Sequence, residues 1–253
     1  MRILLALATL VLLGSCAHFS EERREKARLQ FEIAMGYLES GSYPEALNHF
    51  LKAHELDPDD PHILNGLGLT YFHRGRVDLA KKHLLKAIKK KPSYTEAINN
   101  LSFILIENQQ YAEAEKYIKR ALQDLTYPKP ATALLNLGYL NYKINKLEAA
   151  KRPVTQALQY DRDNCFGNHL LAKIYYAEHD FKNAARAFDK ASAVCSLDAA
   201  DEIHYYAGMS YQKAGDLSRA KARYQEILRL FPESNYRDLA EDQIQRIERV
   251  LSQ

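Results

Sequence analysis

The side chains best suited to chemistry are three histidines in the first third of the chain, His62, His73 and His83. Imidazoles bind metal ions or transfer protons when they converge with other such groups on one point. These three fall on different faces of the predicted helices, which favours solvated or capping side chains over metal ligands. The chain also contains no Gly-rich phosphate loop, no H-E-x-x-H motif and no C-x-x-C motif. We therefore predict no metal, cofactor, catalytic residue or small-molecule substrate, and the protein is not expected to be an enzyme.

The charges of the chain are interleaved along the sequence. The 35 Lys and Arg alternate with 32 Asp and Glu, for a formal net charge of +3. A nucleic-acid-binding protein would carry a clustered basic face, so no nucleic-acid partner is expected. The run Lys89-Lys90-Lys91 ends a predicted helix, where cations complement the helix dipole.

The chain begins with a targeting segment. Residues 3–13 are a continuous apolar run that follows a single basic residue, Arg2. Such a run is too short to cross the hydrocarbon core of a membrane, which needs about 20 residues. A basic start, a short apolar run and small residues before a cleavage point are typical of a secretory signal, which we assign to residues 1–15.

The apolar run ends at Leu13-Gly14-Ser15-Cys16, which resembles the lipobox of bacterial lipoproteins. The resemblance implies cleavage before Cys16, diacylation of its thiol and acylation of the new N-terminus, with palmitate as an expected acyl chain. Two or more acyl chains make a stable membrane anchor. The alternative is an ordinary secretory signal whose removal leaves Cys16 as a free thiol. Ala17 follows the cysteine, where an inner-membrane retention signal would have Asp, so the expected location is the periplasmic face of the outer membrane, with residues 16–26 as a lipidated tether.

A 34-residue internal repeat determines where the remaining side chains lie. Ala46, Ala80 and Ala114 are 34 residues apart, and the same interval separates Pro58 from Pro92. A period of this length indicates stacked helical hairpins, and the frame resembles the tetratricopeptide repeat. Two-residue slips precede the fourth and the sixth copies. The predicted copies are residues 27–60, 61–94, 95–130, 131–164, 165–200 and 201–234.

The fold class that follows is all-α, a right-handed superhelix (solenoid) of six tetratricopeptide repeats. One hairpin leaves an apolar face exposed, and stacking of hairpins buries it. Residues 235–253 are predicted to form a C-terminal capping helix with a polar outer face. The length of the chain also allows two domains, but the recurrence of the repeat predicts a single array. Pro153 falls inside a helix of the fourth repeat, where it should kink that helix at a cost of about 3 kcal/mol unless another interaction compensates.

In arrays of this kind the first helix of each pair lines the concave surface, chiefly through positions 2, 5, 9 and 12 of the repeat. Through the first four repeats these positions are mostly apolar, which suits an amphipathic helix or an apolar strand of a protein partner. The alternative is that these side chains pack only against one another in a tightly wound superhelix. The predicted partner-binding residues are Phe31, Met35, Leu38, Leu69, Phe72, Phe103, Ile106, Leu135, Tyr139 and Tyr142.

Two further cysteines, Cys165 and Cys195, occupy positions 1 and 31 of the fifth repeat. Antiparallel helices bring these two positions to the same end of the hairpin, and the expected periplasmic location is oxidising. A disulfide between them is therefore predicted, on the condition that their Cα atoms lie within about 7 Å of each other.

The whole layout resembles the PilF/PilW-type lipoproteins of type IV pilus biogenesis, which share a lipobox, a short tether, six repeats and a closing helix. The likeness is greatest over residues 121–151, where the insertion containing Tyr127-Pro128 matches a junction of that family. The resemblance implies a pilotin, an adaptor that binds secretin subunits, localises them and promotes their multimerisation at the outer membrane. The implied partners are the secretin, through an apolar or amphipathic segment, and the outer membrane, through the lipid on Cys16.

A second function from another class of adaptor fits the same features. An outer-membrane tetratricopeptide lipoprotein could instead act as a scaffold for peptidoglycan hydrolases or envelope-assembly factors. Both proteins would have the lipobox and the solenoid, so the sequence alone leaves the two functions open.

Overall fold

The computed structural model describes the backbone of residues 2–196 and 200–252 and the side chains of residues 21–196 and 200–252. Within these ranges the chain forms thirteen helices and no strand. It divides into two compact units, Met1–Asp124 (unit 1) and Leu125–Gln253 (unit 2). The side chain of Cys16, the predicted lipidation site, lies outside the described residues.

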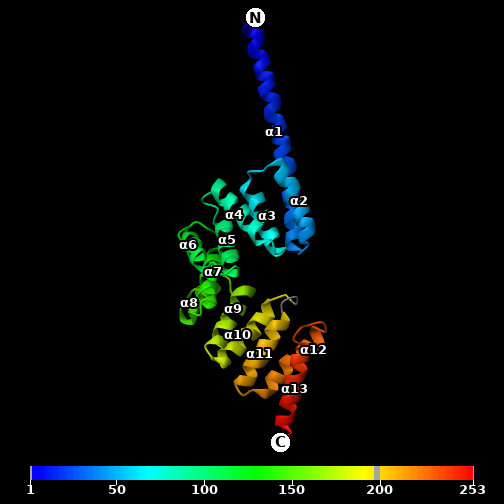
Figure 1. Cartoon of the computed structure of the whole chain (residues 1–253), viewed down its shortest axis with the longest axis vertical. Coiled ribbons are helices and arrows are strands. Elements are labelled where there is room, and N and C mark those ends of the chain that lie inside the picture. Colours follow the sequence, from blue (N-terminus) through cyan, green and yellow to red (C-terminus); the bar gives the residue numbers. More distant parts are fainter. Residues whose placement is uncertain (1, 197–199, 253) are drawn as a thin grey trace. The chain divides into compact units, whose positions relative to one another are not determined.

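Unit 1 consists of three antiparallel helical pairs, which Figure 1 shows in blue to green. Each pair falls within one predicted repeat, although the first helix starts earlier and runs through the predicted boundaries at residues 15 and 26. The helices are α1 (Arg2–Glu39), α2 (Tyr43–Leu56), α3 (Pro61–His73), α4 (Val77–Lys90), α5 (Thr95–Glu107) and α6 (Tyr111–Leu122).

Unit 2 consists of three more pairs and a final helix, in green to red in Figure 1. The pairs begin within one residue of the predicted repeats, and the final helix lies inside the predicted capping segment. The helices are α7 (Pro130–Lys143), α8 (Leu147–Tyr160), α9 (Cys165–Ala177), α10 (Phe181–Val194), α11 (Ala200–Lys213), α12 (Leu217–Leu230) and α13 (Arg237–Leu251).

The boundary between the two units lies between α6 and α7. It falls at the start of the predicted insertion, residues 124–130, between the third and fourth helical pairs. Pro128 and Pro130 lie in this insertion. Proline has no backbone N–H and disfavours the helical conformation of the preceding residue, so the helical path is interrupted here.

All six hairpin turns share one backbone conformation. In each turn the residue after the C-cap has a positive φ, and its N–H and the next N–H donate to carbonyls three and five residues earlier. This is the Schellman arrangement, which normally favours glycine. Three of the six positions are glycine, and two others are asparagine and histidine, which adopt a positive φ more readily than most residues; the exception is Gln109. The six residues are Gly41, Gly75, Gln109, Asn145, His179 and Gly215.

Small residues on the first helix of a pair face large residues on the second. A Cβ atom on Gly208 would lie 2.6 Å from the ring of Tyr224, and one on Gly138 would lie 2.3 Å from Cγ2 of Val154. Tyr224 and Val154 are fully buried. The close approach of the two helices therefore requires glycine at these crossings.

Pro153 is buried inside α8, which continues unbroken from Leu147 to Tyr160. A proline cannot donate to the carbonyl four residues earlier, which belongs to Ala149. Asn141 of α7 supplies a donor instead, because its Nδ2 lies 3.2 Å from the Ala149 oxygen. This contact is the compensation that the sequence prediction required.

Candidate protein-binding site

Six of the predicted partner-binding residues form a half-buried surface on the first helices of unit 1. Phe31, Met35 and Leu38 of α1 pack against a core that includes Phe50. The Phe31 ring meets the Phe50 ring edge-on at 5.9 Å between centroids. Each of the six side chains retains solvent contact, so each is available to a partner. We call this set the unit-1 apolar surface: Phe31, Met35, Leu38, Leu69, Phe72 and Phe103.

Two of the predicted residues, Ile106 and Leu135, are not available to a partner. Ile106 is 0% exposed and Leu135 is 5% exposed. Ile106 lies on α5, where nine of thirteen residues are buried. Leu135 of α7 lies within van der Waals reach of the Gly167 backbone on α9, where a Cβ would be 3.1 Å from its Cδ2. Both residues therefore belong to the core, and their assignment to the groove was wrong.

The two remaining predicted residues, Tyr139 and Tyr142, are half-buried on α7. The Tyr139 ring meets Phe166 edge-on at 5.3 Å and carries the Lys143 ammonium 5.2 Å from its centroid. Burial raises the pKa of Tyr142, and the nearby Tyr206 and Glu202 of α11 act in the same direction.

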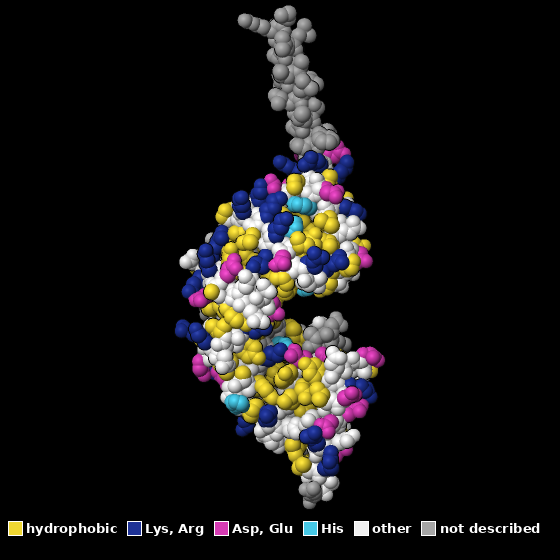
Figure 2. Space-filling view, in the orientation of Figure 1, with side chains coloured by type: hydrophobic (Ala, Val, Ile, Leu, Met, Phe, Trp, Pro, Cys, Tyr) yellow, Lys and Arg dark blue, Asp and Glu magenta, His cyan; other side chains and the backbone are white. Residues whose placement is uncertain are grey.

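Unit 2 carries an aromatic surface that the sequence analysis did not assign. Tyr205 stacks on Tyr236 at 4.7 Å between centroids, and the Tyr176 ring meets both Phe181 and Tyr206 edge-on at 5.5 Å. Figure 2 shows a continuous hydrophobic patch on this unit. We call this set the unit-2 aromatic surface: Tyr176, Phe181, Tyr205, Tyr206, Met209 and Tyr236.

A signal for this surface was present in the sequence. Tyr176 and Met209 occupy positions 12 and 9 of the fifth and sixth repeats, the same positions that defined the predicted groove. The prediction stopped at the fourth repeat because Lys173 and Gln212 interrupt the apolar pattern in the last two. In the structure Lys173 pairs with Glu202 at 3.0 Å, and Gln212 bonds to Gln243, so neither side chain disrupts the surface.

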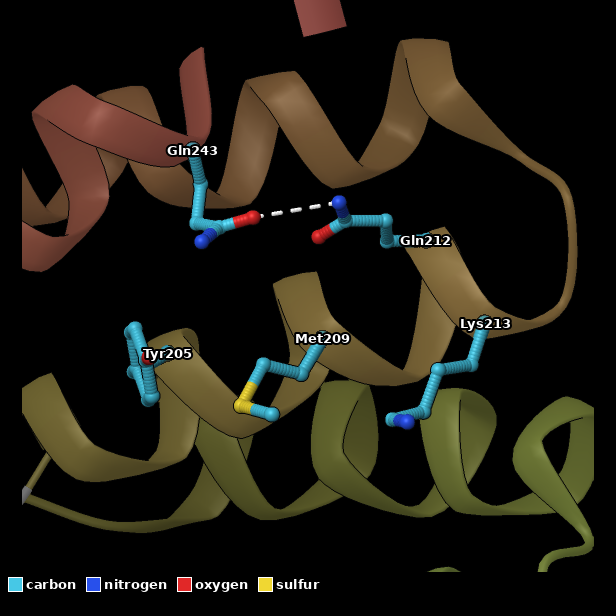
Figure 3. Close-up of a pocket in the computed structure, with 5 residues that line it drawn as sticks. All are labelled: Tyr205, Met209, Gln212, Lys213 and Gln243. Atoms are coloured by element: carbon cyan, nitrogen blue, oxygen red, sulfur yellow. Dashed lines mark hydrogen bonds between the residues drawn. The ribbon is translucent and has the colours of Figure 1, made fainter. Parts of the chain in front are cut away.

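A cavity of about 260 Å³ adjoins the aromatic surface. Four of its lining residues, Tyr205, Met209, Gln212 and Lys213, lie on α11 with the spacing of one helical face, and Gln243 comes from α13 (Figure 3). Tyr205 and Met209 provide apolar walls. The capping helix therefore takes part in a cavity that no single repeat could form.

The three histidines considered as ligands each contact a different tyrosine. His62 Nδ1 lies 3.0 Å from the Tyr94 hydroxyl, and the His73 ring stacks on Tyr43 with 4.6 Å between centroids. His83 stacks on Tyr71. In the part of the chain that the structure describes, no group of three or more His, Cys, Asp or Glu side chains could hold a metal ion.

Cys165 and Cys195 form a disulfide in the structure, with 4.9 Å between their Cα atoms. Cys165 is the first residue of α9, and Cys195 caps the C-terminus of α10. The bridge therefore joins the two helices of the fifth repeat at their shared end.

None of the described helices is long and apolar enough to span a membrane.

Comparison with known proteins agrees with the architecture. Models described as TPR repeat or tetratricopeptide repeat match residues 37–75, 61–94, 104–159 and 202–234. The type IV pilus assembly protein PilF of Pseudomonas aeruginosa strain PAO1 is 25% identical over 171 residues, which are 67% of this chain and 68% of PilF.

Two solved structures of pilus proteins share the fold. The structure of Pseudomonas aeruginosa PilF has a TM-score of 0.70 at 22% identity and covers 90% of this chain and 98% of its own. PilW, described as a widely conserved type IV pilus biogenesis factor, has a TM-score of 0.72 at 21% identity and covers 87% of this chain and 97% of its own. Repeat matches in both units and six helical pairs show that the chain is built from tetratricopeptide repeats; it is similar in sequence to PilF and in fold to the PilF and PilW structures.

Proposed function

We propose that the protein is a lipid-anchored adaptor of type IV pilus biogenesis that binds secretin subunits, localises them to the outer membrane and promotes their multimerisation. It acts by binding alone and catalyses no reaction. The observation that carries the proposal is the unit-1 apolar surface, in a chain whose sequence resembles PilF over two thirds of its length.

The chemistry of the unit-1 apolar surface suits a protein segment. Its six side chains are aromatic or aliphatic, and a ring contact between Phe72 and Phe103, 5.9 Å between centroids, joins the second repeat to the third. Contiguous apolar surface on a water-exposed protein usually marks an interface. An amphipathic helix or apolar strand of a secretin could place its apolar side chains here.

The membrane anchor in this proposal is Cys16. Acyl chains on its sulfur and on the amino group that cleavage exposes would hold the protein to the periplasmic face of the outer membrane. Helix α1 continues from this region into unit 1 as the first helix of the first pair. Cys16 and three residues of the unit-1 apolar surface, Phe31, Met35 and Leu38, therefore lie on one helix.

The experiment compares secretin assembly in cells with and without this protein. Membranes from a deletion strain are run on a gel without boiling and probed for the pilus secretin. We expect the heat-stable multimer to disappear and secretin monomer to remain in the inner membrane. Unchanged multimers in the outer membrane would contradict the proposal and favour the scaffold for hydrolases or envelope-assembly factors.

Two variants separate the two parts of the mechanism. Cys16→Ser should yield a folded protein that is absent from the outer membrane. Leu69→Glu should yield a correctly localised protein that no longer supports the secretin multimer, because a carboxylate on the apolar surface must be desolvated when the client binds. Leu85→Glu is the matched control, since Leu85 lies on α4, the second helix of the same repeat, and is 39% exposed. Normal multimers with both Cys16→Ser and Leu69→Glu would refute the mechanism.

A further inference from the structure

The cavity between α11 and α13 is lined both by hydrogen-bond donors and by apolar side chains. Tyr224 is fully buried, and its hydroxyl donates to Gln212 Oε1 at 3.0 Å. Burial raises the pKa of Tyr224, so the hydroxyl keeps its proton and needs an acceptor. Gln212 must therefore present its carbonyl oxygen to Tyr224 and its amide nitrogen to the other side.

The orientation of Gln212 determines that of Gln243. Gln212 Nε2 donates to Gln243 Oε1 at 3.1 Å. The oxygen of the Gln243 side chain is therefore an acceptor in this bond, and its amide nitrogen remains free to donate. Figure 3 shows this nitrogen on the side of Gln243 that faces Tyr205 and Met209. Among the described residues no acceptor is bonded to it. The chain Tyr224–Gln212–Gln243 thus supplies a fixed N–H donor to the cavity.

Lys213 supplies the second donor, and this one is charged. Its ammonium lies 5.1 Å from the centroid of the Phe181 ring, and in the described part of the chain no carboxylate pairs with it. None of the five residues that line the cavity is acidic. The cavity therefore offers one cation and one amide donor without offering a matching anion.

The walls of the cavity are held in place before any ligand binds. The Tyr205 ring stacks on Tyr236 and also contacts Tyr206 and Tyr224 at 5.8 and 5.9 Å between centroids. Met209 Sδ lies 4.0 Å from the Tyr176 hydroxyl. These contacts preorganise the apolar walls, which reduces the entropy lost on binding.

We propose that this cavity binds the C-terminal residue of a protein partner, with an apolar side chain between Tyr205 and Met209 and its carboxylate on Lys213 and Gln243. The volume of about 260 Å³ is smaller than the roughly 300–1,000 Å³ of typical small-molecule pockets, so it takes about one residue. Only a C-terminal residue carries an apolar side chain and a main-chain carboxylate together. The preceding residues of the partner would lie over the unit-2 aromatic surface. This site is separate from the unit-1 apolar surface and does not depend on the identity of its client.

The experiment measures peptide binding to the full chain in detergent by fluorescence anisotropy. The probe is Ala-Ser-Gly-Leu-Phe with a dye on its N-terminus and a free C-terminal carboxylate. The comparison peptides are the same sequence with a C-terminal amide, and an amidated peptide that carries an internal Glu beside Phe. We expect the free acid to bind about tenfold more tightly than either amide, since a charge-assisted hydrogen bond is lost. Equal affinity for the free acid and either amide would overturn the proposal.

Variants tie the binding to this cavity. Lys213→Met and Gln243→Leu should each weaken binding of the free acid about tenfold and leave the weaker amide binding unchanged. Lys182→Met is the control, because Lys182 is an exposed lysine of the same unit outside the cavity. Thermal melting of each variant verifies folding. The proposal would be overturned if the free acid did not bind, or if folded Lys213→Met bound it with unchanged affinity. Secretin multimerisation is measured separately and tests the adaptor function.

Discussion

The two units repeat the same helical hairpin three times each but fill it with different side chains. In unit 1 the largest fully buried side chains are mainly aliphatic, among them Leu64, Leu67 and Leu101. In unit 2 they are Tyr224 and Phe188. Eleven of the 17 tyrosines follow residue 124.

A tyrosine core brings polar groups into the interior, and these must be satisfied. In unit 2 the Tyr211 hydroxyl donates to Asp189, Asp189 pairs with Arg223 at 2.8 Å, and Arg223 pairs with Glu226 at 2.7 Å. The same requirement aligns Tyr224 with Gln212. Unit 1 therefore presents a mainly apolar surface to a partner, whereas unit 2 also presents hydrogen-bond donors whose directions are fixed.

The largest expected effect concerns the disulfide, which only unit 2 has. Cys195→Ser should lower the free energy of unfolding of unit 2 by about 3 kcal/mol, because the unfolded chain gains the freedom of a loop that the bridge closed. Urea unfolding followed by hydrogen exchange reports each unit separately. Unit 1 is the internal control, and equal destabilisation of both units would show that they do not unfold independently.

A pair of glycine substitutions should have effects of opposite sign. Gly208→Ala in unit 2 would bring a Cβ to 2.6 Å from the Tyr224 ring and should destabilise that unit by about 1–2 kcal/mol. Gly36→Ala in unit 1 meets no atom within 4 Å and should stabilise its helix by up to about 1 kcal/mol. Thermal denaturation of the two variants measures the difference. Stabilisation by Gly208→Ala would mean that α11 and α12 pack less closely than described.

Asn141→Ala should lower the free energy of unfolding by about 1 kcal/mol, because the carbonyl of Ala149 then loses its side-chain donor. Pro153→Ala restores a backbone N–H to that carbonyl, so Asn141→Ala should cost close to nothing in the Pro153→Ala background. A double-mutant cycle measures this coupling. Additive effects of the two substitutions would contradict the compensation.

The smallest effect is a pH dependence in unit 1. Burial lowers the pKa of His83 to about 4, and His54, Lys82 and Lys86 act in the same direction. Between pH 6.5 and this value the unfolded state binds a proton that the folded state does not, so stability falls as the pH decreases through this window and then levels off. The effect is small because the side chain is only partly buried, so water still screens the charge of the imidazolium. Urea unfolding at several pH values measures how the free energy of unfolding depends on pH. His83→Gln should make this dependence weaker, and an unchanged dependence would mean that other groups cause it.

The sequence by itself determined the 34-residue repeat and the positions of the helical pairs that follow from it. A 34-residue interval is visible without any knowledge of packing, and it located all six helical pairs and the hairpin end where Cys165 and Cys195 meet. Apolar positions on the first helices indicated Phe31, Leu69 and Phe72 as surface residues for the same reason. These are properties of local periodicity.

Only the tertiary structure decided which of those positions stay open and which side chains assist one another. Ile106 and Leu135 satisfy the groove pattern, but neighbouring helices bury them. Gln243 lies 31 residues from its partner Gln212, and Asn141 reaches a carbonyl on the following helix, so neither contact follows from one repeat frame. Burial and hydrogen bonding depend on what lies across an interface between helices, and a periodic pattern specifies only which face a residue occupies.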